Sequence, residues 1–411
     1  MVAIHPFRAL RYDPARVGDL SRVLAPPYDI IDPEEQERLY DASPYNVVRL
    51  ILGRQHPTDT EADNRYTRTA RDFRAWRDDA ILAPDAAPAL YLIQQTFSDG
   101  KARHSRLGFL ALLGLEGADG RAIYRHEATL AAPKADRTRL LEAVPANLEP
   151  IFCVYPDEQG AMQRVLEGMA ERLAPIAQPV VKGEQIRLWA VTDAEAIAQA
   201  RRHLSGTAVL IADGHHRFEV AYAHRATYPS LMSFFVSMAD PALVVRPIHR
   251  VVARQRAVEA LAGQSCCSIE PAANLDAVLR WLGEDGARGR FGCYDGRRLV
   301  RVQLAAEALA AWLMAPTVPL PVATLDVSLL HGVVLPRLGA DEAGVRYFAD
   351  AAQALAAAQQ APGGGAWLLR GIPLAQVYAL AAQGMTLAPK STYFYPKVPS
   401  GLAINPLDLP S

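Results

Sequence analysis

The sequence predicts a mixed α/β protein, and three patterns support this fold class. Residues 90–97 read as a strand, and residues 107–115 supply a second strand-like run that would be its antiparallel partner. Residues 158–173 have amphipathic helical spacing, and at residues 207–222 a short apolar run passes directly into helical spacing. Strands and helices therefore alternate along the chain.

The composition limits the classes of function. The chain has 411 residues, 50% of them hydrophobic, which is enough for two or three domains with sizeable cores. Its 43 basic and 44 acidic side chains nearly cancel, whereas proteins devoted to nucleic acid usually carry a large basic excess. Nucleic acid is therefore disfavoured as the main partner, although a local basic patch stays open.

Cysteine usage and the apolar segments indicate the compartment. No Cys-x-x-Cys pair or regular spacing occurs, so we expect reduced core residues rather than a zinc site at Cys153, Cys266, Cys267 and Cys293. The amino terminus shows no secretory signal, and Pro316, Pro319 and Pro321 interrupt the uncharged residues 308–325. We expect a soluble, cytoplasmic protein without a membrane partner.

The first elements are predicted from prolines and caps. The two prolines of residues 26–29 predict an extended segment, and a helix should begin at Pro33 with Asp32 as its cap. A rigid loop is the alternative. Residues 61–80 intersperse acidic and basic side chains and predict a solvated helix.

A polar cluster at residues 124–129 follows the strand pair. Glu127 lies beside Arg125 and His126 and is followed by Thr129. A carboxylate in this setting can accept a proton or hold magnesium. An exposed strand end would look the same and need no function, so both interpretations stay open.

Further elements are expected before the central turn. Lys134 and Arg137 share a face near the start of a helix that should end near Pro145; they extend a phosphate site or belong to ordinary surface. Strands and a helix are expected at residues 151–155, 188–191 and 194–204, with Asp193 capping the helix.

The densest group of polar residues lies where the strand at residues 207–211 turns into the next helix: Asp213, Gly214, His215, His216 and Arg217. The unpaired N–H groups at a helix start, the helix dipole and Arg217 together favour an anion, most naturally a phosphate. The alternative is an ordinary Asp-Gly turn in which Asp213 is a cap and the histidines are structural.

A third polar cluster lies in the β-like residues 244–252, after a strand expected at residues 231–238. His249 and Arg250 interrupt this apolar run, and a buried Arg250 would require a partner. The pair is therefore a candidate for the same pocket.

From residue 253 onward the chain is rich in alanine and contains no catalytic motif. We expect helices, a strand pair, a further helix, a strand and a last helix, with ordered elements at residues 290–304, 325–338, 366–370 and from Pro373. Near the end, Lys390 is followed by the hydroxyls of Ser391 and Thr392, which can contact a phosphate or carboxylate but lack the glycine loop of a P-loop.

These motifs resemble a known family. The string Ala-Asp-Gly-His-His-Arg-Phe-Glu at residues 212–219 resembles the signature of the bacterial and archaeal family "domain of unknown function 1015". Residues 26–29, 43–48, 126–129 and 389–397 are similar to other motifs of that family. Gly214 to Arg217 is also similar to the Gly-x-x-Arg phosphate turn of the ParB and sulfiredoxin superfamily, which includes a free-serine kinase.

The resemblance implies a ParB/sulfiredoxin-like core in residues 1–252 and a C-terminal α/β domain in residues 253–411. It implies that a nucleotide contacts Gly214, His215, His216, Arg217, His249, Arg250, Lys390, Ser391 and Thr392. It implies substrate contacts for Tyr28, Asp29 and Asn46, catalytic roles for Glu127, Asp213, His215 and His216, and magnesium on Glu127 and Asp213.

The leading hypothesis is a nucleotide-dependent phosphotransferase that acts on a small hydroxylated metabolite, with free serine the first candidate by analogy. The cofactor would be ATP or ADP, or CTP, with magnesium. Phosphoryl transfer needs a phosphate cradle, neutralising charge and a group that orients the acceptor. Residues 214–217 would form the cradle, Lys390 and His249 would add charge, and Glu127 or Asp213 would be the base.

Three alternatives belong to other classes. A nucleotide-gated regulator of ParB type should carry a basic helix-turn-helix, which residues 253–411 do not show. A catalytically inert metabolite-binding protein differs from a kinase only in turnover. A metal site would use His126, His215, His216 and His249, although their spacing is not that of helical ligands. Sulfiredoxin-like reduction is disfavoured because its cysteine position is His215.

Overall fold

The computed structural model describes residues 1–99, 102–116, 122–252, 261, 264–284, 286, 288–339, 344–361 and 363–408. The chain forms two compact units. Unit 1 contains Met1–Arg125, Thr129–Val244 and the segment from Pro396 onward, and unit 2 contains His126–Ala128 and Val245–Tyr395. Both combine helices with sheets, so the mixed α/β class is confirmed.

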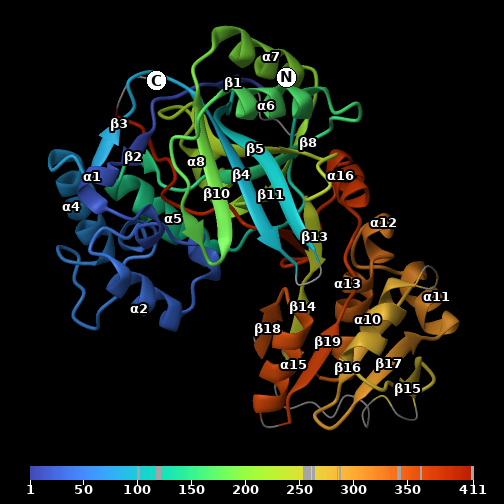
Figure 1. Ribbon diagram of the computed structural model, residues 1–411. Coiled ribbons are helices and arrows are strands. Elements are labelled where there is room, and N and C mark those ends of the chain that lie inside the picture. Colours follow the sequence, from blue (N-terminus) through green and yellow to red (C-terminus); the bar gives the residue numbers. More distant parts are fainter. Residues whose placement is uncertain are drawn as a thin grey trace. The chain divides into compact units, whose positions relative to one another are not determined.

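In the described residues, the sheet of unit 1 has nine strands in the order β6-β11-β8-β12-β5-β4-β10-β9, with β1 beside β5. Figure 1 labels β1, β4, β5, β8, β10 and β11 of this sheet. The strands are β1 (Ile4–His5), β4 (Leu90–Ser98), β5 (Arg103–Gly114), β6 (Ile123–Tyr124), β8 (Ile151–Tyr155), β9 (Val180–Val181), β10 (Glu184–Val191), β11 (Val209–Asp213) and β12 (Ser230–Ser237). β6 pairs in parallel with β11, and β8 with β12; the other pairs are antiparallel. The predicted hairpin is confirmed, with Tyr91 opposite Leu110.

The longer helices of unit 1 are α2 (Pro33–Ala42), α4 (Arg65–Asp78), α5 (Ala131–Ala143), α6 (Ala161–Arg172), α7 (Ala194–Ser205) and α8 (His215–Ala223). Asp32 and Asp193 cap α2 and α7 as predicted. Apolar side chains of α6, α7 and α8 share one core with the sheet, including Leu166, Ala200 and Phe218. This packing fixes the direction of α8 relative to β11.

The C-terminal segment returns to unit 1. β21 (Asn405–Pro406) pairs antiparallel with β7 (Ala146–Asn147), and the amide of Ser400 donates to the carbonyl of Ala25. The predicted boundary after residue 252 therefore differs from the structure, in which unit 2 begins at Val245 and ends at Tyr395. Residue 253 itself lies outside the described residues.

Unit 2 is built, in its described part, on a six-stranded antiparallel sheet in the order β15-β17-β16-β19-β14-β18. Its strands are β14 (His249–Val252), β15 (Cys267–Pro271), β16 (Arg290–Tyr294), β17 (Leu299–Leu304), β18 (Val345–Phe348) and β19 (Gly365–Leu368). The helices are α10 (Leu275–Gly283), α11 (Ala306–Met314), α12 (Leu320–Ala323), α13 (Asp326–Leu329), α14 (Leu335–Arg337), α15 (Ala351–Gln360) and α16 (Leu374–Ala382). Val278, Ala354 and Leu368 lie in its core.

Two predicted elements of unit 2 are interrupted. The β-like run at residues 244–252 divides into β13 (Val244–Pro247), which pairs with β20 (Thr392–Tyr395), and β14, which joins the six-stranded sheet. The helix expected at residues 325–338 contains a π-helical segment, Leu330–Val334, between α13 and α14.

The cysteines and the helices bear on two further expectations. Cys153 and Cys293 are core residues, as expected, but Cys266, in the turn before β15, and Cys267, in this edge strand, are only partly buried. Among the helices that the structure describes, none has the length and apolar character required to span a bilayer.

Candidate functional site

The turn between β11 and α8 is shaped by Gly214. This residue occupies the cap position of α8 with φ +92° and ψ 29° in the left-handed region, which favours glycine. A Cβ atom there would lie 2.8 Å from Cγ2 of Ile151. Glycine has no side chain, so the cap residue supplies no acceptor for the first helical N–H groups. Asp213 is therefore not the cap that the plain-turn alternative required.

Replacing Gly214 by alanine should cost more stability than the same change at Gly183, which has φ +81° but no atom within 4 Å of its Cβ position. Both substitutions incur about 1 kcal/mol or more for the left-handed backbone, and Gly214→Ala adds about 1–3 kcal/mol of overpacking. Urea unfolding of the two variants measures this difference. Equal losses would show that the turn can move away from Ile151.

Arg217 stabilises the turn through two hydrogen bonds. Its Nη2 donates to Oδ2 of Asp213 at 2.8 Å, and its Nη1 donates to the carbonyl of Pro150. Burial alone would lower the pKa of Arg217, but the carboxylates of Glu149, Asp213 and Asp29 raise it above its ordinary value. The guanidinium is therefore charged and held inside the protein, with 10% of the side chain exposed.

Lys397 joins two carboxylates of the predicted site. Its Nζ lies 2.5 Å from Oδ1 of Asp213 and 2.7 Å from Oδ2 of Asp29. The side chain is only 8% exposed, and burial alone would lower its pKa, but the two carboxylates raise that pKa well above 10.5. The sequence motifs at residues 26–29, 213–217 and 389–397 thus meet at one ammonium group.

Glu149 connects the turn to Tyr28. Its Oε1 accepts the amide of Tyr28 at 3.1 Å and the hydroxyl of Ser400 at 2.9 Å. Arg137 lies 3.8 Å from Oε2 of Glu149, and its guanidinium stacks 3.9 Å above the Tyr28 ring. Burial raises the pKa of the Tyr28 hydroxyl to about 12, although Arg137 and Arg217 act in the opposite direction. Tyr28 is therefore neutral at physiological pH.

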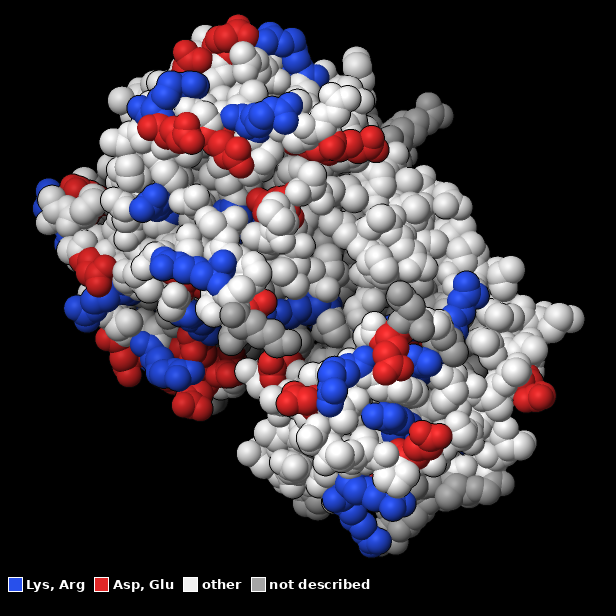
Figure 2. All heavy atoms as spheres, turned by 45° about the vertical axis from the view of Figure 1, so that its right-hand side comes forward, with Lys and Arg blue, Asp and Glu red and all other residues white. Residues whose placement is uncertain are grey.

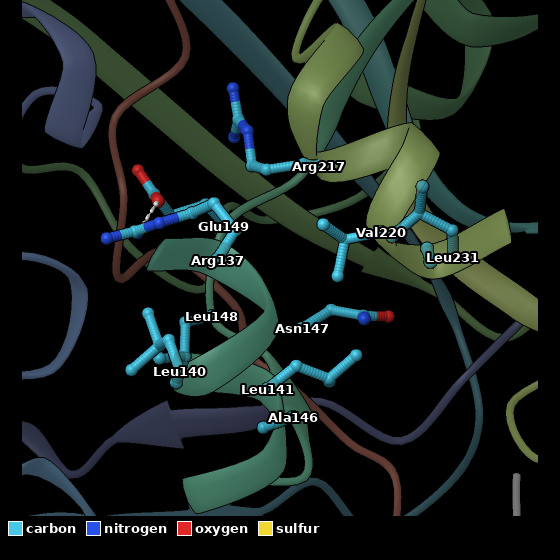
Figure 3. A pocket seen from close by; sticks show the side chains of 11 residues that line it. Arg137, Leu140, Leu141, Ala146, Asn147, Leu148, Glu149, Arg217, Val220 and Leu231 are labelled. Atoms are coloured by element: carbon cyan, nitrogen blue, oxygen red, sulfur yellow. Dashed lines mark ion pairs between the residues drawn. The ribbon is translucent and has the colours of Figure 1, made fainter. Parts of the chain in front are cut away.

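A small pocket lies beside this network, between α5 and α8. Figure 3 shows the Arg137–Glu149 ion pair at one end, with Leu140, Leu141 and Val220 among the apolar residues that line the rest. Its volume is about 70 Å³, whereas sites for larger ligands are about 300–1,000 Å³. The pocket can hold a few water molecules but not a nucleotide.

The histidines of the turn lie on α8 itself. His215 is buried, and Nε2 of His216 accepts the amide of Leu130 at 2.9 Å. One turn further along, Glu219 accepts the hydroxyl of Thr129 at 2.8 Å and Nζ of Lys134 at 3.1 Å. Burial would raise the pKa of Glu219, but these two bonds lower it. The predicted helix with Lys134 therefore docks on α8 through Glu219.

The side chain of Asn46 forms hydrogen bonds with backbone groups. It is fully buried, its Nδ2 donates to the carbonyls of Arg22 at 2.8 Å and Leu24 at 3.1 Å, and its Oδ1 accepts the amide of Val48 at 2.9 Å. These bonds give Asn46 a structural role, and the substrate contact that the family resemblance implied stays a prediction. Asn46 holds the loop that leads into α3 (Val48–Ile51).

The other predicted residues belong to unit 2. Oε1 of Glu127 accepts the amide of Lys390 at 2.8 Å, and Nη2 of Arg250 donates to the Lys390 carbonyl at 3.0 Å. Lys390 has φ +60°, which is uncommon for a residue with a side chain. His126 bonds Thr392 through Nε2 and Oγ1 at 2.8 Å. Glu127 and Arg250 thus fix the backbone of the closing motif.

His249 does not supply the predicted positive charge. Burial, aided by the neighbouring Arg250, lowers its pKa to about 4. Its Nδ1 accepts the amide of Leu369 at 3.2 Å, so Nε2 carries the proton of the neutral ring. A neutral ring adds no positive charge, so this lowered pKa disfavours the expected role of His249 beside a phosphate at neutral pH.

The side chains of the predicted site form a poor donor set for a metal ion. Among the described residues, no three His, Cys, Asp or Glu side chains are grouped so as to hold a metal ion, so the four-histidine alternative is not supported. Asp213 fits magnesium poorly, because Arg217 and Lys397 already occupy its two oxygens. Glu127 lies in unit 2 and accepts a backbone amide.

Sequence reasoning missed three residues as members of the site: Lys397, Glu149 and Glu219. Lys397 closes the motif at residues 389–397, and it belongs to the segment from Pro396 onward, which lies in unit 1 with Asp213. The available signal was that Lys397 is the last residue of this family motif, directly after Tyr395-Pro396. Glu149 lies in Asn147-Leu148-Glu149-Pro150, which was interpreted only as the segment that leads into the strand at residues 151–155.

Solved structures show limited similarity. SbnI from Staphylococcus aureus, truncated at its C-terminus, is 10% identical, and the match covers 74% of this chain and 90% of that chain with a TM-score of 0.39. A conserved hypothetical protein from Pyrococcus furiosus is 13% identical (73% and 97%, TM-score 0.37), and a free serine kinase in complex with AMP is 12% identical (69% and 86%, TM-score 0.34). These TM-scores are too low to establish a shared fold.

The sequence itself gives a clearer relationship. No curated protein matches the chain. The family model described as "Protein of unknown function (DUF1015)" matches residues 4–328, which is most of the chain and includes the turn at residues 213–217. The chain therefore belongs to this family.

Proposed function

We propose that unit 1 binds a nucleotide through its phosphates at the start of α8 and transfers a phosphoryl group to a small hydroxylated metabolite. The observation that carries this proposal is the left-handed Gly214 at the cap position, directly beside the charged group of Asp213, Arg217 and Lys397. A helix start binds phosphate through its N–H groups and dipole. The ParB/sulfiredoxin-like relationship, and free serine as the first acceptor to test, rest on the family resemblance.

The reaction needs one carboxylate near the acceptor. The hydroxyl oxygen of the acceptor would bond to the γ-phosphorus of ATP, the bond to the bridging oxygen would break, and ADP would leave. The hydroxyl proton would pass to Asp29, whose side chain is more exposed than that of Asp213, at 25% against 19%. Lys397 would hold Asp29 in place. Glu127, Lys390 and Thr392 belong to unit 2, and their part in this reaction stays a prediction.

A thermal-shift panel of ATP, ADP, CTP and GTP, with and without magnesium, tests nucleotide binding, because a ligand of the folded state raises its melting temperature. His216→Glu should weaken binding about tenfold or more, since a carboxylate at the helix start repels phosphate while it favours the helix dipole. His216→Gln, which keeps an acceptor for the Leu130 amide without the charge, should retain the shift. No shift with any nucleotide would refute the proposal.

Turnover is tested by ADP release from ATP in the presence of serine and related alcohols. Asp29→Asn should abolish release and keep the ATP-induced shift, because the amide cannot take the proton but remains near Lys397. If Asp29→Asn reduces ADP release and the ATP-induced thermal shift by the same fraction, Asp29 acts in nucleotide binding rather than in proton transfer.

A catalytically inert metabolite-binding protein is the second candidate. One observation favours it: the cations Arg137, Arg217 and Lys397 are already compensated by Asp29, Glu149 and Asp213 inside unit 1. A nucleotide shift without turnover for any acceptor would support this candidate. A DNA clamp is less favoured, since Figure 2 shows basic and acidic side chains of the described residues interspersed on one face without an extended area of either sign.

A further inference from the structure

Unit 2 contains a cavity that lies within its own residues and shares none with the turn in unit 1. Its volume is about 520 Å³, within the range of about 300–1,000 Å³ that small-molecule sites occupy. Apolar side chains form much of its wall, including Ile248, Leu282, Leu325 and Leu369. Polar side chains complete the wall: Arg250 from β14, Asp326 from the start of α13, Arg370 from the segment after β19 and Ser391 from the segment before β20. Such a mixed lining suits a ligand with both an apolar and a charged part.

Arg250 is the most buried charged group of this wall, with 1% exposed. It donates to the carbonyls of Ile248 and Lys390 and, through Nε, to Nε2 of His331 at 3.3 Å. All three acceptors are uncharged, and among the described residues no carboxylate forms an ion pair with Arg250. Burial lowers the pKa of Arg250 to about 10, against the effects of Tyr347 and Glu127, so it stays charged at neutral pH.

A buried cation without an ion-pair partner costs free energy. In Arg250, one of the hydrogen bonds that offset this cost goes to a residue of an irregular helical segment. His331 lies in the π-helical segment Leu330–Val334. π-Bulges are rare and occur frequently at functional sites. The imidazole that accepts the hydrogen bond from Nε of Arg250 therefore projects from this irregular segment.

The other buried charges of the wall are already compensated. The carboxylate of Asp326 accepts hydrogen bonds from Nε of Arg370 at 2.5 Å and from the amide of Gly289 at 2.8 Å. Glu284 is exposed and lies 3.6 Å from Arg290. Arg288 is also exposed. Among the described residues of the wall, Arg250 is therefore the buried charge that has no ion-pair partner, although Glu127 acts on it from a distance, and it matches a ligand with one negative charge.

We propose that this cavity binds a small organic carboxylate, whose carboxylate group pairs with Arg250 and whose apolar part lies against Leu282, Leu325 and Leu369. The hydroxyl of Ser391, which lines the cavity and donates to the Ala388 carbonyl at 2.6 Å, can accept a hydrogen bond from a hydroxyl on the ligand. Arg250 and Ser391 then serve this cavity rather than the nucleotide. The inference does not depend on the proposed phosphotransferase activity.

Calorimetric titration of the full chain with isovalerate and 3-hydroxybutyrate tests the proposal. We expect millimolar or tighter binding, weaker by about tenfold or more for the uncharged isovaleramide, because the charge-assisted pair is lost. Inorganic phosphate should not compete. Equal binding of the amide, or binding of phosphate instead of either carboxylate, would overturn the proposal, as would the absence of heat with both acids.

Variants locate the binding. Arg250→Lys should weaken carboxylate binding about tenfold, because a point charge cannot pair with the ligand through two parallel hydrogen bonds. Gln376→Trp introduces a large side chain from the exposed face of α16 and should block the cavity without touching Arg250. Arg346→Gln on β18, whose guanidinium donates to the Ala357 carbonyl away from the cavity lining, should bind as the natural protein does. Unchanged affinity in Gln376→Trp would place the acid elsewhere and refute the assignment.

Discussion

Replacing Lys397 by methionine is expected to destabilise unit 1 by about 3–5 kcal/mol, the range for breaking a buried ion pair. The ammonium lies 2.5 Å from Asp213 and 2.7 Å from Asp29, with 8% of the side chain exposed. Methionine fills a similar volume but leaves Asp29 and Asp213 facing each other, with only Arg217 as a counter-charge beside Asp213. Urea unfolding at pH 7 measures the loss, and the ATP-induced thermal shift should vanish with the geometry of the turn.

The pH dependence separates this electrostatic effect from a packing defect. In the natural protein the pKa of Lys397 is raised above 10.5, so its contribution is complete below that pH and is lost only as the pH rises further. In Lys397→Met, protonation of one carboxylate relieves the repulsion, so the difference from the natural protein should shrink as the pH falls from about 7 to about 4.

The double variant Lys397→Met with Asp213→Asn is the matched control. It removes one of the two opposed charges and should recover about half of the lost stability if repulsion dominates. A stability difference that does not change with pH, together with no recovery in the double variant, would mean that Lys397 acts through packing. The turn would then not depend on its charges.

The elements that could be predicted are those with strong local signals. The strand signal at residues 90–97 and the caps Asp32 and Asp193 act within a few residues, and the structure confirms the strand and both caps. The strand-to-helix step at Asp213 and Gly214 was also readable, because a left-handed glycine between an apolar run and helical spacing is a local property.

The elements that could not be predicted depend on distant partners. The run at residues 244–252 reads as one strand, but it divides at Ile248 because β13 and β14 pair with different sheets. Strand identity reflects cross-strand packing more than intrinsic preference, so no local pattern marks this division.

The same reasoning applies to the sites. Tyr28, Asp29, Asp213 and Arg217 were identified as separate motifs, but Lys397, which pairs with both Asp29 and Asp213, lies 184 residues beyond Asp213. The role of Asn46 as a backbone anchor was equally invisible, since a buried asparagine and a ligand-binding one look alike in sequence. Arg250 was recognised as needing a partner, but the uncharged acceptors around it and the cavity beside it are tertiary features.

Acidification is expected to destabilise unit 2 through His249. Its pKa is lowered from 6.5 to about 4 in the folded protein by burial and by Arg250. Above pH 6.5 the ring is neutral in both states and stability is unaffected. As the pH falls from 6.5 to about 4, the unfolded chain takes up a proton that the folded state refuses, so about 3 kcal/mol of stability is lost.

His249→Asn tests this expectation, because an asparagine Oδ1 can take the place of Nδ1 as acceptor for the Leu369 amide while it cannot be protonated. Urea unfolding of both proteins at pH 7 and pH 4.5 gives the difference in pH dependence that belongs to His249. The variant should start less stable at pH 7, because the smaller side chain leaves space in the core, and lose less on acidification, so that the two stabilities converge. If both proteins lose the same amount between these pH values, His249 is either solvated or already protonated in the folded state. Its neutral role in unit 2, and with it the exclusion of His249 as a source of charge for a phosphate, would then have to be abandoned.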